Sequence, residues 1–178
     1  MLAFVIFSRG WTIFLLGMLV LSPILVLNKI GILKSEYTKK VFLKFFFGGV
    51  AEEKMQKWGK NFCSTMLPKL FRDLALEKLN FHRSKGHLVY VVTASLDVWV
   101  QPWLETQGLN GICTRMLFED GKFKGNLDGP NCNGPEKEVR IRSELDLSHF
   151  QKIFAYGDSS GDKEMLALAD RPYFKRFL

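Results

Sequence analysis

Apolar residues recur at three- and four-residue spacing through the first 80 residues of the chain. One stripe covers residues 41–46 and a second covers residues 55–70. Such spacing is typical of amphipathic helices that bury one face. Gly48-Gly49 separates the two stripes and predicts a break between helices. We therefore predict an all-helical unit for residues 1–80, in which the aromatic side chains of both stripes form a core.

The most apolar part of this unit is Gly10 to Asn28, a run of 19 uncharged residues. A run of that length suffices on paper to cross a hydrocarbon core of about 30 Å. A secretory signal, a transmembrane helix, and one or two apolar helices that pack in a bundle or lie in the membrane interface are the alternatives. The run is followed by no small-residue cleavage pattern, and Ser22-Pro23 interrupts it near the middle. Because proline breaks helical hydrogen bonding, we favour two shorter helices, bundled or interfacial.

The pattern changes after Gly86, where HLVYVV reads as a buried strand of a parallel sheet. It ends in three small residues, TAS, before a helical segment that closes near Gly108. Asp120-Gly121 predicts a hairpin turn between two short strands, because both positions favour positive φ. KIFAY, ending at Tyr156, predicts another buried strand. We therefore expect an α/β core in residues 81–178, with ligands bound where strands end and helices begin.

GDSSGD, which follows the last of these strands, places Asp158 and Asp162 four residues apart. Carboxylates at the end of a strand, spaced by glycine and serine, can converge where Mg²⁺ binds beside a phosphate, because Mg²⁺ prefers oxygen ligands. A solvated turn with a helix-capping aspartate would use the same residues. Two earlier positions favour the first interpretation: a strand that ends at Thr93, and Lys137 on a predicted helix.

Composition narrows the class of protein. The chain has 178 residues, of which 47% are hydrophobic, which excludes intrinsic disorder. Its three cysteines show neither zinc-ligand nor disulfide spacing, so we expect a reducing compartment, the cytoplasm. The net charge is +7, and the first 50 residues hold six basic residues against one acidic residue. Because these basic residues stand among apolar ones, we expect association with the inner face of a membrane and no nucleic-acid partner.

The ordered elements resemble the motifs of the haloacid dehalogenase-like hydrolases, in particular subfamily IB, which includes phosphatidylglycerophosphatase C and phosphoserine phosphatase. VYVVTASLDVWVQPW is similar to the second motif, NCNGPEKEVRI to the third, and AYGDSSGDKEMLALADRPYFKRF to the fourth. The resemblance implies a three-layer Rossmann-like α/β core with a parallel sheet in residues 81–178. It implies a helical cap in residues 1–80.

The same resemblance implies a Mg²⁺-dependent phosphatase that forms an aspartyl-phosphate. Thr93 and the amide of Ala94 would bind phosphoryl oxygens, and Lys137 would neutralise charge on the intermediate. Asp158 would bind Mg²⁺, and Asp162 would support the metal or the lysine. The hydrophobic, basic cap favours a lipid-linked or membrane-proximal phosphate as substrate over a soluble small molecule.

The family's first motif, a strand followed by Asp-x-Asp-x-Thr, is missing from the sequence, which contains no Asp-x-Asp. We expect the natural protein to begin about 15 residues before Met1, the length of one strand and its loop. Without the aspartyl nucleophile and the first core strand, the chain as written should be inactive. The alternative is a membrane-associated phosphate-binding or scaffold protein that has lost its nucleophile.

Overall fold

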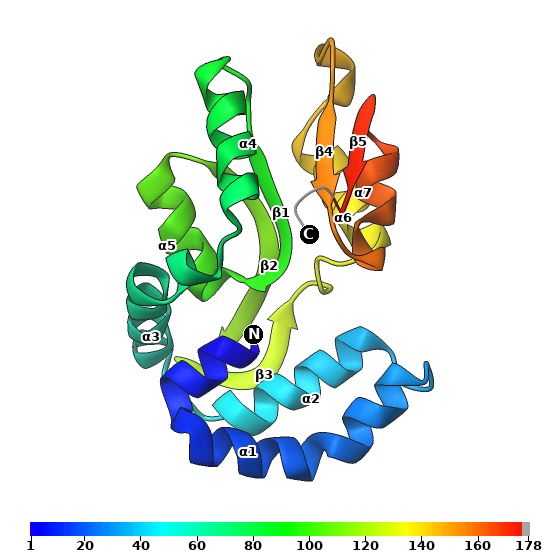
Figure 1. Cartoon of the computed structure of the whole chain (residues 1–178). Coiled ribbons are helices and arrows are strands. Elements are labelled where there is room, and N and C mark those ends of the chain that lie inside the picture. Colours follow the sequence, from blue (N-terminus) through cyan, green and yellow to red (C-terminus); the bar gives the residue numbers. More distant parts are fainter. Residues whose placement is uncertain (176–178) are drawn as a thin grey trace.

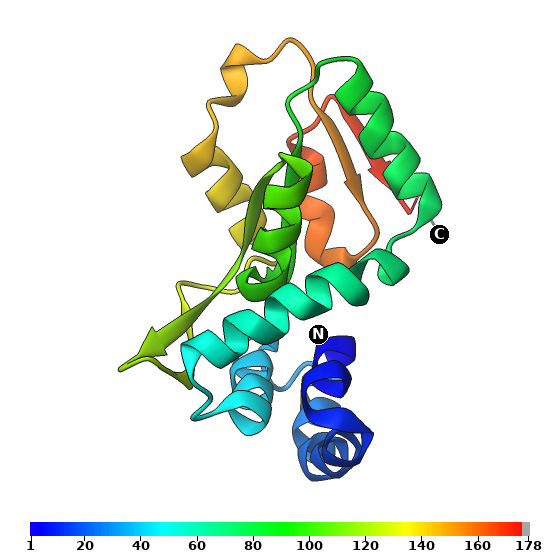
Figure 2. The same cartoon turned by 90° about the vertical axis from the view of Figure 1, so that its left-hand side faces the viewer.

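The computed structural model describes residues 1–175, and its first part is helical, as predicted (Figure 1). Arg176 and Phe177, the last residues quoted for the fourth motif, lie outside the described residues. Helices α1 and α2 lie together at one end of the molecule (Figure 2). The helical elements are α1 (Leu2–Lys29), α2 (Ser35–Phe47), α3 (Glu52–Thr65), the short 3-10 helix η1 (Leu67–Leu70) and α4 (Asp73–Ser84).

Helix α1 corrects the expectation of a break at Ser22-Pro23. Pro23 lies inside the helix, and the non-helical residue is Gly10, with φ 82° and ψ 166°. Only glycine adopts that conformation readily. Pro23 cannot donate to the carbonyl of Leu19, but the Ser22 hydroxyl donates to it at 2.7 Å. The lost backbone bond is thereby replaced, and the helix continues to Lys29.

The second part of the chain alternates strands and helices. Strand β1 ends at the start of α5, which closes at Gly108 with φ 61°, as the sequence predicted. Asp120 and Gly121 both have positive φ, and they form the predicted hairpin turn. The elements are β1 (Tyr90–Leu96), α5 (Asp97–Gln107), β2 (Asn110–Glu119), β3 (Lys122–Asp128), α6 (Pro135–Glu144), η2 (Leu147–His149), β4 (Phe154–Gly157), η3 (Ser160–Asp162), α7 (Lys163–Ala167) and β5 (Arg171–Phe174).

The strands form two separate sheets. Strand β2 pairs in parallel with β1 and antiparallel with β3, while β4 and β5 form a parallel pair. Within residues 1–175, no ladder joins β1 to β4, although the two strands face each other across the middle of the molecule (Figure 1). The predicted α/β class with parallel pairing is confirmed. The sheet, however, is split where β1 and β4 would otherwise be joined.

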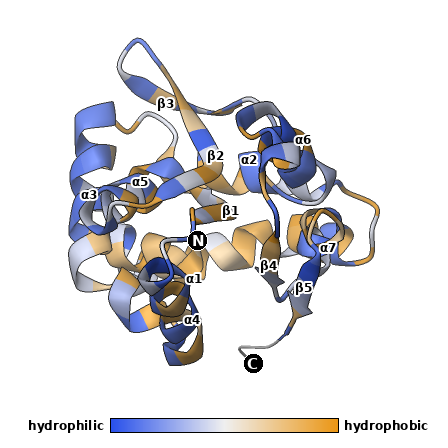
Figure 3. Ribbon diagram, turned by 90° about the horizontal axis from the view of Figure 1, so that it is seen from above, coloured by the Kyte–Doolittle hydropathy of each residue, from blue (hydrophilic) through white to orange (hydrophobic). Residues whose placement is uncertain are grey.

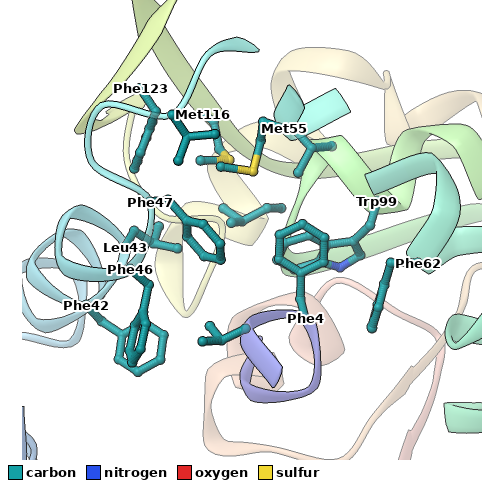
Figure 4. Close-up of a cluster of buried hydrophobic side chains, with 14 of the residues drawn as sticks. Phe4, Phe42, Leu43, Phe46, Phe47, Met55, Phe62, Trp99, Met116 and Phe123 are labelled. Atoms are coloured by element: carbon teal, nitrogen blue, oxygen red, sulfur yellow. The ribbon is translucent and has the colours of Figure 1, made fainter. Parts of the chain in front are cut away.

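One hydrophobic cluster extends from the helical part into the α/β part (Figure 4). The Phe4 ring, fully buried, lies 4.4 Å from the Trp99 ring and 5.3 Å from the Phe62 ring, measured between centroids. Helices α3 and α5 meet closely, because a Cβ on Gly59 would lie 1.9 Å from the carbonyl oxygen of Val98. Since the two parts share a core, their division into residues 1–80 and 81–178 stays a prediction.

Helix α1 exposes most of its apolar side chains. The hydropathy colouring of the ribbon shows how apolar this helix is (Figure 3). By length and composition it is the one helix among residues 1–175 that could cross a membrane, and 17% of its most apolar window is buried. Its buried face consists of Phe4, Val5, Phe14, Gly17 and Leu21. The exposed large apolar side chains between residues 11 and 32 are Trp11, Ile13, Leu15, Leu16, Leu19, Val20, Val26, Leu27, Ile30 and Ile32. We call this set the α1 apolar face.

Candidate active site

A cleft of about 1040 Å³ lies between the open sides of the two sheets and the cap helices. Its core wall is formed by the end of β1, the start of α6 and the loop after β4, and its cap wall by α1 and α2. The structure brings all five sequence-predicted site residues into this cleft. They are Thr93, Ala94, Lys137, Asp158 and Asp162.

The end of β1 is shaped by a local irregularity. The pairing of β1 with β2 shifts between Thr93 and Leu96, so Ala94 and Ser95 bulge from the ladder. The hydroxyl oxygen of Thr93 accepts a hydrogen bond from the amide of Ser95 at 3.1 Å. Because that bond uses the oxygen only as an acceptor, the hydroxyl hydrogen stays available for a ligand.

Lys137 and Asp162 form a buried ion pair beside this strand end. The Lys137 ammonium is 2.5 Å from Oδ1 of Asp162 and donates to the carbonyl of Val92 at 3.0 Å. Burial opposes ionisation of Asp162, but hydrogen bonds from Lys137 and Ser159 outweigh it and lower the pKa of the carboxyl below its usual value. An ammonium has three donors, so Lys137 keeps one for a further acceptor in the cleft.

The loop after β4 owes its shape to Asp162 and two glycines. Oδ2 of Asp162 accepts hydrogen bonds from the amides of Asp158 and Ser159 at 3.1 and 2.9 Å, and from the Ser159 hydroxyl at 2.8 Å. A Cβ on Gly157 would lie 2.6 Å from the Asp162 Cβ, and one on Gly161 would lie 2.0 Å from the Asn133 side chain. The glycines therefore allow the loop to close on itself and on the loop that leads into α6.

The carboxylates of this loop differ in what they offer a metal ion. Both oxygens of Asp162 are engaged within the protein, whereas Asp158 lines the cleft and pairs with Arg72 at 3.0 Å. Within residues 1–175 no group of three or more histidine, cysteine or acidic side chains could hold a metal. The residues described here do not fit Mg²⁺ by themselves, because one half-exposed, ion-paired carboxylate is too few ligands.

Sequence reasoning missed the cap wall. Lys39 of α2 donates to the carbonyl of Ala94 at 2.5 Å and to Oδ1 of Asn131 at 2.6 Å, which ties the cap to the end of β1. Its neighbour Thr38 also lines the cleft. A signal was present, because Lys39 stands three residues before Phe42, on the side of the helix that the apolar stripe buries. Arg72 offered no such signal.

Solved structures share this architecture. A protein of unknown function from Bordetella pertussis Tohama I superposes with a TM-score of 0.74 at 22% identity, covering 85% of this chain and 70% of that one. A phospho-aspartyl intermediate analogue of phosphoserine phosphatase superposes with a TM-score of 0.56 at 23% identity, covering 84% of this chain and 69% of that one. At these identities the likeness shows the fold.

Curated relatives are similar along most of the chain. Protein CicA of Caulobacter vibrioides is 33% identical over 141 residues, which are 78% of this chain and 63% of the relative. The Inhibition of morphological differentiation protein of Streptomyces azureus is 25% identical over 173 residues, covering 83% of this chain and 60% of the relative. This chain thus spans less than two thirds of their length. A model of the haloacid dehalogenase-like hydrolases matches residues 1–167, and the chain therefore belongs to that family of enzymes.

Proposed function

We propose that this chain provides the phosphate-binding half of a Mg²⁺-dependent phosphomonoesterase that works through an aspartyl-phosphate. The observation that carries the proposal is the convergence of Thr93, Lys137 and the Asp158–Asp162 loop on one cleft, from three separate segments. Strand ends and helix starts are where α/β enzymes of this architecture bind anions. Family membership supports a hydrolase.

Each residue has a defined task in this proposal. The Thr93 hydroxyl and the Ala94 amide donate to phosphoryl oxygens, and the third ammonium donor of Lys137 neutralises charge that builds up on them. Asp162 is a positioning residue, since it holds Lys137 and the backbone of the loop. Mg²⁺ would supply charge neutralisation next to the phosphate, with Asp158 as one of its ligands, but it requires carboxylates beyond those described.

The nucleophile is the missing component. We infer that a strand ending in Asp-x-Asp-x-Thr belongs between β1 and β4, because Val91 and Val92 on one side and Tyr156 and Gly157 on the other line the cleft between two unjoined sheets. A strand placed there would bring its acidic end to Thr93 and Asp158. The chain of 178 residues is on this account inactive, as no residue in it replaces an aspartyl nucleophile.

The test is hydrolysis of p-nitrophenyl phosphate with Mg²⁺. We expect no turnover by the chain alone, and turnover once an amino-terminal extension with an apolar strand and Asp-x-Asp-x-Thr is added. An extension with Asn in place of the first Asp is the matched control and should stay inactive. Turnover by the unextended chain that Lys137→Met abolishes would refute the need for the extra strand.

For the substrate we propose a lipid-linked phosphate reached from the cytoplasmic face of a membrane. The cap wall of the cleft is apolar, with Met18, Leu25 and Phe42 among its lining residues, so an acyl chain would find contacts there. The α1 apolar face lies outside the cleft and is flanked by the exposed lysines Lys29 and Lys34. Apolar surface with basic flanks suits an anionic bilayer.

Sedimentation with vesicles tests the membrane part. We expect binding to vesicles of phosphatidylglycerol and phosphatidylcholine, and weaker binding by a Lys29→Glu/Lys34→Glu variant. Leu19→Glu, which places a carboxylate on a side chain that is 72% exposed, should reduce binding without affecting the core. Equal pelleting of all three proteins, or none by wild type, would exclude a role for this surface.

A second function is favoured by one observation, the ion pair between Arg72 and Asp158. This pair occupies the carboxylate that a metal would need, as in a membrane-associated phosphate-binding or scaffold protein without turnover. The extension experiment separates the two functions. Phosphate binding that persists without turnover in the extended chain would favour the binding protein.

A further inference from the structure

Two neighbouring side chains of α2, Thr38 and Lys39, face the cleft from the cap side. They lie across from the end of β1, because the Lys39 ammonium contacts the carbonyl of Ala94 at 2.5 Å. Asn131, from the loop between β3 and α6, is the other contact of this ammonium, at 2.6 Å. Lys39 is thus a cationic group on the cap beside the proposed phosphate-binding end of the core.

Lys39 lacks a counter-ion. Both of its hydrogen-bond acceptors are neutral oxygens, and the ion pairs found within residues 1–175 do not include it. Glu36, on the same helix, is engaged by Lys40 at 2.8 Å and by the amide of Asn131. A partly buried ammonium without a carboxylate is unfavourable, and an anion that enters the cleft would relieve that cost.

The state of the Thr38 hydroxyl is a second and independent observation. Its side chain is 7% exposed, and its hydroxyl has no hydrogen-bond partner among the described residues. Buried hydroxyls are normally paired, since leaving one unpaired costs free energy. The hydroxyl oxygen is itself buried, so a ligand oxygen bound at Lys39 would pair with it once the Thr38 side chain turns toward the cleft that this residue lines.

We propose that Thr38 and Lys39 form a cap-side oxyanion subsite that contacts a phosphoryl group held at the end of β1. The inference rests on the phosphate site proposed above and adds to it a second set of contacts, from the cap wall. An anionic oxygen outcompetes the neutral oxygens of Ala94 and Asn131 for the ammonium, because charge-assisted hydrogen bonds are the stronger ones. The ligand would therefore be bound between the cap and the core. The apolar lining of the cap would then favour a phosphate monoester with an apolar tail.

Calorimetric titration with inorganic phosphate tests the subsite in the chain as it stands, without turnover. Lys39→Met should weaken phosphate binding about tenfold or more, and Thr38→Val about fivefold, as expected for a charged and a neutral hydrogen bond. Lys40→Met is the matched control. It removes the same charge from the adjacent residue, which pairs with Glu36, and should change the affinity less than about twofold.

Variants of the core wall separate this inference from the proposed function. If Lys137→Met or Thr93→Val abolishes binding while Lys39→Met matches Lys40→Met, the phosphate site stands and the cap subsite is wrong. If Lys39→Met alone abolishes binding, the cap binds an anion but the proposed phosphate site is wrong. If wild type binds no phosphate at millimolar concentrations, both are wrong.

Acylation of lysines in the wild-type protein is a second measurement that needs no variant. Lys39 and Lys40 are modified by limiting acetic anhydride and quantified by peptide mass spectrometry. Phosphate should protect Lys39 at least about fivefold and leave Lys40 unchanged, because of these two lysines Lys39 alone lines the cleft. Equal modification of Lys39 with and without phosphate would overturn the subsite.

Discussion

The two walls of the cleft place their lysines in opposite electrostatic surroundings. On the core wall, Lys137 pairs with Asp162, and that carboxylate accepts three further hydrogen bonds from its own loop. On the cap wall, the described residues offer Lys39 only neutral oxygens and leave the neighbouring Thr38 hydroxyl without a partner. The charge of Lys137 is therefore balanced before a ligand arrives, whereas the charge of Lys39 is balanced by the ligand. Stability and binding should accordingly separate between the two lysines.

The largest effect should come from breaking the ion pair between Lys137 and Asp162 on the core wall. Lys137→Met leaves the Asp162 carboxylate, which is 5% exposed, without its cation. Removing one partner of a buried ion pair costs about 3–5 kcal/mol. Urea unfolding measures the free-energy change, and Lys137→Met/Asp162→Asn, which removes both charges, should recover part of the loss. If Lys137→Met lowered the free energy of unfolding no more than the replacement of an exposed lysine does, the ion pair would not stabilise the core wall.

Removal of the Lys39 ammonium should increase the free energy of unfolding, whereas removal of the Lys137 ammonium should decrease it. Burial lowers the pKa of Lys39 to about 8, and Arg140 adds a weaker lowering effect. Cys132, Cys113 and Asp97 raise this pKa, but by less than burial lowers it. The unfolded chain therefore binds a proton that the folded chain lacks between about pH 8 and pH 10.4, and wild-type stability rises with pH there. Lys39→Met should be more stable than wild type by about 2 kcal/mol at pH 7, with the gap closing toward pH 10. Unfolding at both pH values, with Lys40→Met as control, measures this.

A smaller effect is expected in acid. The folded pKa of Asp162 is lowered, so its contribution to stability is present above the unfolded carboxyl pKa of about 3.9 and is lost as the pH falls through the folded value. Wild type should lose stability below about pH 4 more steeply than Asp162→Asn, although it starts from a higher level. Parallel acid limbs for the two proteins would show that Asp162 is not held ionised by its loop.

The smallest effect belongs to the ion pair at the mouth of the cleft. Arg72 and Asp158 are each nearly half exposed, so Arg72→Met should change the free energy of unfolding by less than about 1 kcal/mol. It should nevertheless raise Mg²⁺ affinity in the extended chain, because it frees the Asp158 carboxylate. Isothermal titration with Mg²⁺ checks this, and an unchanged affinity would show that the pair does not compete with the metal.

Local signals in the sequence account for what could be predicted. The strand that carries Thr93, the turn at Asp120-Gly121 and the aspartates after β4 each depend on neighbours within a few residues, and the structure contains all three, although β1 continues past Thr93 to Leu96. Lys39 escaped prediction because its partners are 55 and 92 residues away along the chain. Pro23 was misjudged because a single serine hydroxyl compensates for the bond it removes.

Gly10 also has a mechanical consequence. The segment before it is anchored by Phe4 and Val5, which are fully buried, and the helical segment after it continues to Lys29. At 1.5 Å per residue the second segment is an arm of about 28 Å along its path, and the two backbone dihedrals of Gly10 set its direction relative to the first segment. A rotation of about 10° there would move the far tip by about 5 Å, so a single glycine sets the angle at which the apolar arm meets whatever surface it rests on.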